Sequence, residues 1–153
     1  MENNLSLGKK GQASIEFIFL VIIILVYIHA ILLPTVNYAT SAANDAKRIT
    51  EASFAAQKLA DAINYVSSSS GDSVQVISVF IPKDAAISCA SSSVKMDVSL
   101  DPLTGASAAC GGSLTCTKNY LIAQNISCGN TPGPLMQKYK VYKTGVSTYA
   151  TPI

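Results

Sequence analysis

The chain has 153 residues, a formal net charge of +2 and 13% charged residues. This balance gives no general electrostatic attraction to nucleic acid. The length allows one domain in addition to a separate helical segment. The low charge and the many Ser, Thr and Ala residues after Pro34 suit an uncharged or glycan-covered surface outside the cell.

The first predicted element is an apolar helix over Phe17 to Leu33. These 17 residues would span about 25 Å as a helix, and their apolar neighbours extend them toward the roughly 30 Å of a bilayer core. Lys9 and Lys10 precede the run, and no charge follows it until Asp45. By the positive-inside rule, the N-terminus is cytoplasmic and the chain after the run is outside.

Two ordinary interpretations of this start leave one residue unexplained. A secretory signal would be cut near Ser41 or Ala42, although the apolar run is longer than the usual roughly 7–15 residues. A plain membrane anchor is the second interpretation. Neither interpretation requires Glu16. A carboxylate costs a few kcal/mol inside a membrane, and ionisable residues in membrane helices are typically functional. A simpler role for Glu16 is a favourable interaction with the positive end of the helix dipole at the headgroup level.

The residues around Glu16 form a motif in register with the apolar run. A basic pair and a glycine precede a Q-x-S-x-E sequence, made by Lys9, Lys10, Gly11, Gln12, Ser14 and Glu16. Residues 8–34 resemble the class III leader of type IV pilins, in the archaeal group whose mature chains begin Q-x-S-x-E. The resemblance covers under a fifth of the chain.

The resemblance implies processing of a membrane precursor. A prepilin peptidase would cut between Gly11 and Gln12, so that residues 1–11 are the leader and residues 12–66 the N-terminal helix of the mature subunit. Residues 12–38 would lie in the membrane first and in the filament core afterwards.

The resemblance also implies partners. The family's glutamate at the position of Glu16 pairs with the N-terminus of a neighbouring subunit. If Gln12 is cyclised, Glu16 would instead accept hydrogen bonds from the ring amide or from Ser14 of a neighbour, which makes Ser14 a second assembly residue. Other partners would be further pilins, the peptidase, the assembly platform with its ATPase, and the surfaces or cells that the filament contacts. Archaellum subunits are close relatives, but they usually lack this glutamate.

A helical pattern resumes after Pro34, which removes one backbone donor and is expected to kink the helix. Apolar residues recur every three or four positions, at Ala39, Ala42, Ala46, Ile49, Ala52, Ala56, Leu59, Ile63 and Val66. The small residues of the first half suit close packing between helices, and the larger residues of the second half suit contact with a sheet. Charged residues fall outside this stripe, namely Asp45, Lys47, Arg48, Lys58 and Asp61.

Residues 67–153 predict a β-rich extracellular domain. The polar sequence SSSSGD ends the helix. Alternating or β-branched runs predict strands over residues 74–81, 94–100, 120–127 and 138–143. The predicted fold is α+β, with a long N-terminal helix followed by a small antiparallel sheet packed on it.

The four cysteines, Cys89, Cys110, Cys116 and Cys128, all lie in the domain expected outside the cell. An even number in a small exported domain predicts two disulfides, with three possible pairings. The short CGGSLTC segment favours Cys110–Cys116, which leaves Cys89–Cys128. Gaps of 20, 5 and 11 residues do not fit the closely spaced pairs of a zinc site.

Three further patterns have a functional and a structural interpretation. Asn125 begins an N-glycosylation sequence on the exported side, whereas the matching Asn4 stays in the cytoplasm. QKYKVYK, residues 137–143, interleaves lysines with tyrosines on which bases stack, but lysines that protect an edge strand explain the same pattern, and nucleic acid is disfavoured. For His29, a hydrogen bond to a backbone carbonyl is favoured over a proton-linked role.

The combined prediction is a structural subunit of an archaeal adhesion-type pilus, without a cofactor or metal. The precursor would lie in the cytoplasmic membrane and the mature chain in extracellular filaments. One alternative is a signal-anchored surface-binding domain that never polymerises. The other is an exported enzyme, which is disfavoured because the one histidine, His29, lies in the membrane segment and no glycine-rich phosphate loop is present.

Overall fold

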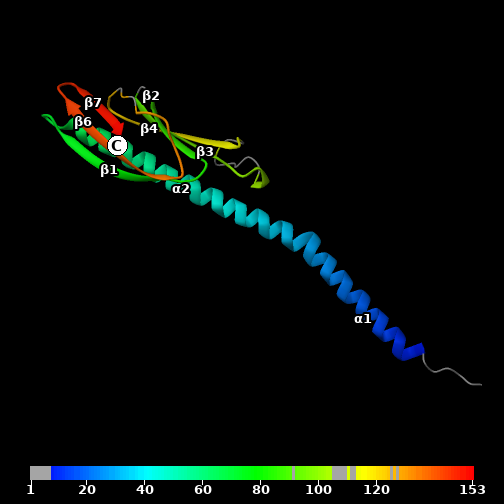
Figure 1. Ribbon diagram of the computed structural model, residues 1–153. Coiled ribbons are helices and arrows are strands. Elements are labelled where there is room, and N and C mark those ends of the chain that lie inside the picture. Colours follow the sequence, from blue (N-terminus) through cyan, green and yellow to red (C-terminus); the bar gives the residue numbers. More distant parts are fainter. Residues whose placement is uncertain (1–7, 91, 105–109, 111–112, 125, 127) are drawn as a thin grey trace, which may run out of the picture. The chain divides into compact units, whose positions relative to one another are not determined.

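The computed structural model describes residues 8–90, 92–104, 110, 113–124, 126 and 128–153, with side chains from residue 15 onward except that of Leu103 (Figure 1). The chain forms two compact units, residues 1–40 and 41–153. A long N-terminal helical region is followed by antiparallel sheets, so the predicted α+β class is confirmed.

The first unit is helical throughout its described part. Helix α1 (Gly8–Tyr27) leads into a single π-helical turn, η1 (Ile28–Leu32), and then into α2 (Leu33–Ser68), whose first residues belong to this unit. The N–H of Leu33 bonds to the carbonyl of Ile28, five residues earlier.

This wider turn lies directly before Pro34, which has no N–H to donate. The single proton of the Thr35 hydroxyl is shared between the carbonyls of Ile31 at 3.0 Å and Leu32 at 2.9 Å. The disturbance expected at Pro34 is therefore a π-turn in the hydrogen-bond ladder.

In the second unit, the later part of α2 lies in a hydrophobic core. The larger residues of the predicted stripe are buried there, as are further alanines beside them: Ala52, Ala55, Ala56, Leu59, Ala60, Ala62, Ile63 and Val66. The buried sector is wider than one stripe because two sheets contribute to the same core. Ala46 of the predicted stripe is exposed.

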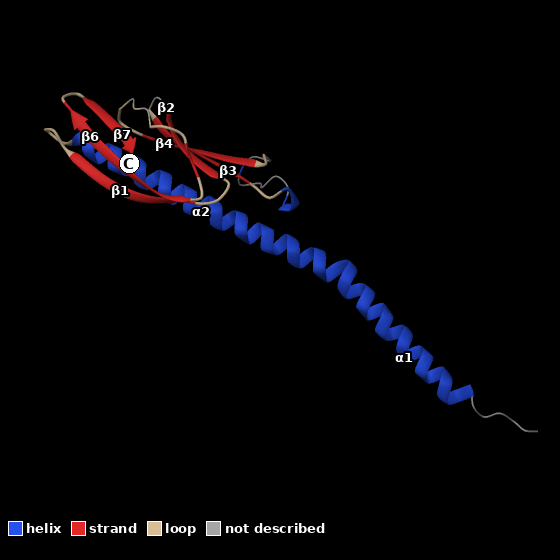
Figure 2. Cartoon of the chain, viewed as in Figure 1, coloured by secondary structure: helices blue, strands red, loops and turns tan. Residues whose placement is uncertain are grey.

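The strands form two antiparallel sheets, shown in Figure 2, where one was predicted. The three-stranded sheet has the order β1-β6-β7, with β1 (Val74–Ile81), β6 (Leu135–Thr144) and β7 (Ser147–Pro152). The four-stranded sheet has the order β4-β3-β2-β5, with β4 (Thr115–Leu121), β3 (Ser93–Ser99), β2 (Ala85–Ala90) and β5 (Thr131–Pro132). A short 3₁₀ turn, η2 (Pro102–Thr104), follows β3.

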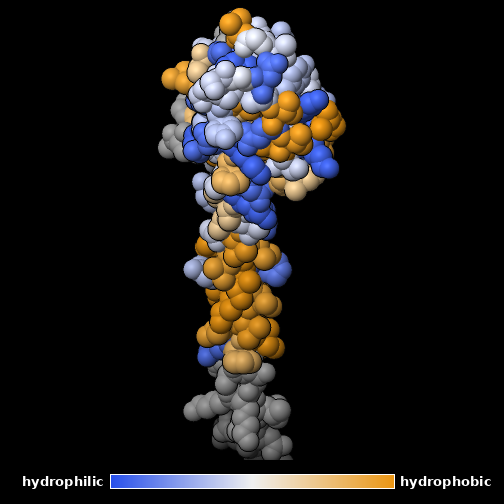
Figure 3. Space-filling model, turned by 90° about the vertical axis from the view of Figure 1, so that its left-hand side faces the viewer, coloured by the Kyte–Doolittle hydropathy of each residue, from blue (hydrophilic) through white to orange (hydrophobic). Residues whose placement is uncertain are grey.

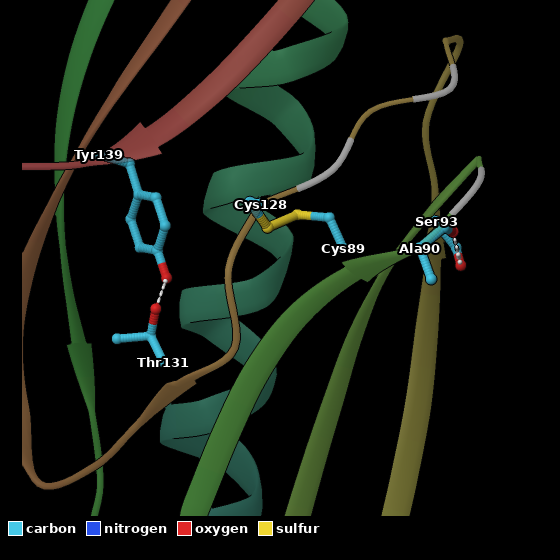
Figure 4. Close-up of a disulfide and its surroundings, with 6 residues drawn as sticks. All are labelled: Cys89, Ala90, Ser93, Cys128, Thr131 and Tyr139. Atoms are coloured by element: carbon cyan, nitrogen blue, oxygen red, sulfur yellow. Dashed lines mark hydrogen bonds between the residues drawn. A yellow bond between two sulfur atoms is a disulfide. The ribbon is translucent and has the colours of Figure 1, made fainter.

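Tyr139 of β6 lies at the centre of this core and is fully buried. Its hydroxyl donates to Oγ1 of Thr131 in β5 at 2.8 Å (Figure 4). Because β5 and β6 belong to different sheets, this buried hydrogen bond links the two sheets across the core.

One predicted strand is wrong. Residues 120–127 were expected to be extended, but β4 covers Thr115–Leu121 and none of the described residues 122–124 and 126 is in a strand. Ile122 and Ile126 are buried without belonging to a sheet. Their apolar character therefore reflects core contact and not strand structure.

The edge-strand explanation for QKYKVYK is also wrong. Strand β6, which contains these residues, is the central strand of the three-stranded sheet. Lysines on it cannot protect a free edge.

Gly133 joins the two sheets by a close backbone approach. A Cβ at this position would lie 2.0 Å from the carbonyl oxygen of Pro82. The N–H of Gly133 donates to the carbonyl of Ala85 at 2.8 Å. Only glycine fits where this connection passes the end of β1.

Candidate functional site

The apolar surface of the first unit is its main chemical feature. Every described side chain from residue 15 to residue 40 is exposed, and the visible face of this helix in Figure 3 is almost entirely hydrophobic. In the part of the chain that the structure describes, this is the one helix long and apolar enough to cross a membrane. Such a surface is unfavourable in water and needs lipid or other apolar helices around it.

Glu16 is the one charged residue between Gly11 and Asp45, and its side chain is exposed on α1. In the uncut chain, α1 begins at Gly8, so Glu16 lies beyond the first helical turn. The favourable field of a helix N-terminus is confined to that turn. In the chain as it stands, Glu16 is therefore too far along α1 for a direct interaction with the helix N-terminus.

The predicted processing site lies at the start of α1. Lys9, Lys10, Gly11 and Gln12 have helical backbone, while their side chains, like that of Ser14, lie outside the described residues. Cleavage between Gly11 and Gln12 would require an extended bond and therefore unwinding of the first turn of α1. Each glycine there costs a helix about 1 kcal/mol relative to alanine, which makes unwinding at Gly11 easy.

His29 bonds within its own helix. Its Nδ1 lies 3.1 Å from the carbonyl oxygen of Leu25, and a carbonyl only accepts, so Nδ1 carries the proton. This is the backbone hydrogen bond favoured from the sequence.

A buried carboxylate in the second unit was missed by the sequence pattern. Asp45 of α2 is buried and accepts hydrogen bonds at Oδ2 from the N–H of Asp101 at 3.0 Å and the hydroxyl of Thr104 at 2.8 Å. Arg48 lies 3.6 Å from Asp45 and 3.4 Å from Asp84, which precedes β2. The i, i+3 spacing of Asp45 and Arg48 is the only sequence signal for this contact.

The lysines of QKYKVYK have separate environments. Nζ of Lys143 donates to the carbonyls of Ser67 at 3.0 Å and Ser69 at 2.6 Å, where α2 ends. This is the favourable place for a cation at a helix C-terminus. Lys138 and Lys140 are exposed on the sheet.

The tyrosines of this segment do not form an open stacking surface. Tyr139 is buried, and the ring of Tyr142 stacks on that of Tyr149 with centroids 5.3 Å apart. Nζ of Lys140 lies 5.6 Å from the centroid of the Tyr142 ring. These rings are already partnered, which weakens base stacking as a role for them.

Two disulfides close the second unit, Cys89–Cys128 and Cys110–Cys116. They are the pairs that the sequence spacing favours. Figure 4 shows the first, between the end of β2 and the segment that leads to β5. Asn125, the predicted glycosylation residue, lies outside the described residues.

Within the described ranges, no group of three or more His, Cys, Asp or Glu side chains is placed to hold a metal ion. Comparison of the chain with protein-family models, with curated proteins and with solved structures finds no match.

Proposed function

We propose that the chain is a structural subunit of an archaeal type IV adhesion pilus. The single observation that carries the proposal is an exposed apolar helix whose one carboxylate, Glu16, follows a basic pair, Gly11 and Gln12 in fixed register. An anchor needs the apolar surface but not the carboxylate. A subunit that assembles through this helix needs both.

In this proposal a prepilin peptidase removes residues 1–11 and the new subunit begins at Gln12. The apolar helix leaves the membrane and packs against the same helix of neighbouring subunits, which supplies the cover that its exposed side chains require. The α-amino group of Gln12 and the carboxylate of Glu16 of a neighbour remove each other's desolvation penalty, whereas either alone is costly.

The β-rich unit would then face the outside of the filament. Its two disulfides suit an oxidising exterior. Surfaces or other cells would be its binding partners.

N-terminal mass spectrometry of surface filaments sheared from cells tests the proposal. The expected N-terminal peptide begins at Gln12, as glutamine or as its cyclised form. Gly11→Val is expected to leave the precursor uncut and to remove the subunit from filaments. Mature protein beginning near Ser41 or Ala42 would instead establish a secretory signal, and an uncut chain absent from filaments would establish a non-polymerising anchored domain.

A further inference from the structure

Strand β1 is an edge strand, and no other strand of its sheet pairs with its outer side. In antiparallel pairs, the N–H and C=O of one residue point to the same side and alternate along the strand. The carbonyl of Ser73 accepts a hydrogen bond from the N–H of Lys143, which continues the β1–β6 ladder. The backbone N–H and C=O groups of Ser73 and of every second residue after it therefore point toward β6. The carbonyl of Ser78 instead accepts from Nζ of Lys58 on α2 at 2.9 Å. The backbone groups of Val74, Val76, Ser78 and Phe80 therefore point to the free edge.

This edge has little protection. Strand β1, VQVISVFI, contains no charge and no proline, and long apolar edges of this kind accept a further strand. Lys58 blocks one carbonyl only. Among the described residues, no other partner satisfies the outward groups of β1.

A groove runs beside this edge, between β1 and α2. Its larger part has a volume of about 520 Å³ and is lined on the helix by Phe54, Lys58 and Tyr65 and on the strand by Gln75 and Ile77. A second part of about 260 Å³ shares Phe54 and Lys58 and continues to Phe80 and Met136.

Two large aromatic side chains of the groove are exposed, beside the charged residues Glu51, Lys58 and Asp61 that also line it. Phe54 is 70% exposed and Tyr65 is 71% exposed. Large aromatic side chains that are exposed to this extent and lie together are typical of surfaces that a partner covers. An edge strand beside an apolar groove is also the setting for recognition by strand addition, in which backbone hydrogen bonds give affinity and the groove receives side chains.

The groove also holds an unsatisfied acceptor. The side-chain oxygen Oε1 of Gln75 is buried and has no hydrogen-bond partner among the described residues. A buried acceptor without a partner is destabilising, so this part of the groove is not optimised in the isolated chain.

We propose that β7 of a second copy of this chain adds to the free edge of β1, with Phe54 and Tyr65 packed over it. The inference rests on the proposed function, which brings copies side by side. Strands β1 and β7 are the two opposite edges of one sheet, and both run antiparallel to β6. They are therefore parallel to each other. Copies in the same orientation present β7 of one to β1 of the next, which is a head-to-tail contact that repeats without closing.

The edge of β7 complements that of β1. The N–H of Ile153 bonds to the carbonyl of Lys138 in β6. By the same alternation, the backbone groups of Thr148, Ala150 and Pro152 point away from β6, to the free edge of β7. Neither strand carries a charge that would repel the other.

Photo-crosslinking in assembled filaments tests this contact. Benzoylphenylalanine replaces Phe54 in the full-length chain, and crosslinked peptides are identified by mass spectrometry. The expected product joins position 54 to residues 147–153 of another copy. The same group at Leu121, an 81% exposed residue of β4 outside the groove, is expected to give no crosslink to that segment. A crosslink from position 54 to another segment or another protein would overturn the contact.

A backbone variant gives an independent measurement. Val76→Pro removes an N–H that faces the free edge and leaves the β1–β6 ladder intact, since proline is tolerated at such positions. Normal processing and folding with about fivefold less filament is expected, because the loss of one edge hydrogen bond lowers the association constant. A wild-type filament yield would overturn the contact alone. A wild-type chain that never forms filaments would overturn the proposed function, and this contact with it.

Discussion

The carboxylate of Asp45 accepts a hydrogen bond of 2.8 Å from the hydroxyl of Thr104, 59 residues later in the chain. This contact fixes the 3₁₀ turn that follows β3 onto α2. Asp45 is 5% exposed, so its charge depends on these polar partners and on Arg48.

We expect Asp45→Ala to lower the free energy of unfolding by about 2–4 kcal/mol, because it leaves Arg48 without its buried partner and removes two hydrogen bonds. Urea unfolding of the full-length chain in detergent measures the change. Asp61→Ala, on the exposed side of α2, is the matched control and should change stability by less than about 0.5 kcal/mol. Equal effects of the two variants would show that the Asp45 network does not stabilise the second unit.

The buried Tyr139 predicts a loss of stability at alkaline pH. Burial raises the pKa of Tyr139 above its ordinary value of 10.0. The folded state then holds this proton more tightly than the unfolded state does, so its stabilising contribution is complete below pH 10.0 and is lost as the pH rises toward the higher folded pKa. Unfolding measured between pH 8 and about 11 should show this decline.

Tyr139→Phe isolates the effect from that of the other tyrosines. At pH 8 the variant should be about 1 kcal/mol less stable, because the hydrogen bond to Thr131 is lost. Above pH 10.0 the difference in free energy of unfolding between wild type and variant should become smaller, because only the wild type loses the contribution of Tyr139. A gap that stays constant to the alkaline limit would contradict the assigned role of burial.

The two disulfides should contribute unequally. Cys89–Cys128 joins residues 39 apart and Cys110–Cys116 joins residues 6 apart. In the chain-entropy model, closing these loops contributes about 4 and about 2 kcal/mol, respectively. Replacing each pair with alanine and measuring urea unfolding should therefore show the larger loss for the Cys89–Cys128 pair. The reverse order would mean that local packing, and not loop closure, decides the contribution.

Under the proposed pilin function, substitutions of Glu16 distinguish an ion pair from simple hydrogen bonding in assembly. Glu16→Leu should be inserted and cleaved but should assemble poorly, because the amine at Gln12 loses its acceptor. Glu16→Gln keeps hydrogen bonding and loses the charge. It should impair assembly if the amine of Gln12 is free, and give near-normal filaments if Gln12 is cyclised.

Filament yield and N-terminal mass, measured on the same preparations, decide between these outcomes. Abundant filaments from Glu16→Leu would assign Glu16 no part in assembly.

Local sequence character predicted several elements. Strand β1 has the predicted bounds, because β-branched residues predominate in VQVISVFI and Pro82 follows it; in the fold its exposed and buried residues alternate. Strand β6 is longer than predicted but includes residues 138–143. The larger residues of the helix stripe, such as Leu59 and Ile63, are buried as expected.

The pattern failed where long-range contacts decide the structure. Strand β2, AAISCA, consists mainly of small residues that carry no strand signal, and it is held between β3 and β5. The segment after β4 was predicted to be a strand, because Ile122 and Ile126 are apolar. In the fold, the side chain of Asn64 binds the backbone of Leu121 and Ala123 and the segment lies on the core as a loop.

Asp45 could not be placed from the sequence for a similar reason. Because Asp45 is polar, it was placed outside the apolar stripe. Its partners Asp101 and Thr104 lie after β3, far from it in the sequence. Only the closed fold brings these groups to it.

The pairing of Ile77 with Tyr139 sets an order for the completion of the second unit. The central strand of the three-stranded sheet, β6, comes late in the chain, so β1 has no neighbour in its sheet until β6 is available. Strands β2, β3 and β4 need no such wait, because they follow one another in sequence and pair with each other. A chain stopped before β6 would keep β1 unpaired and the core side of α2 partly uncovered, and we expect it to be an immature, protease-sensitive intermediate.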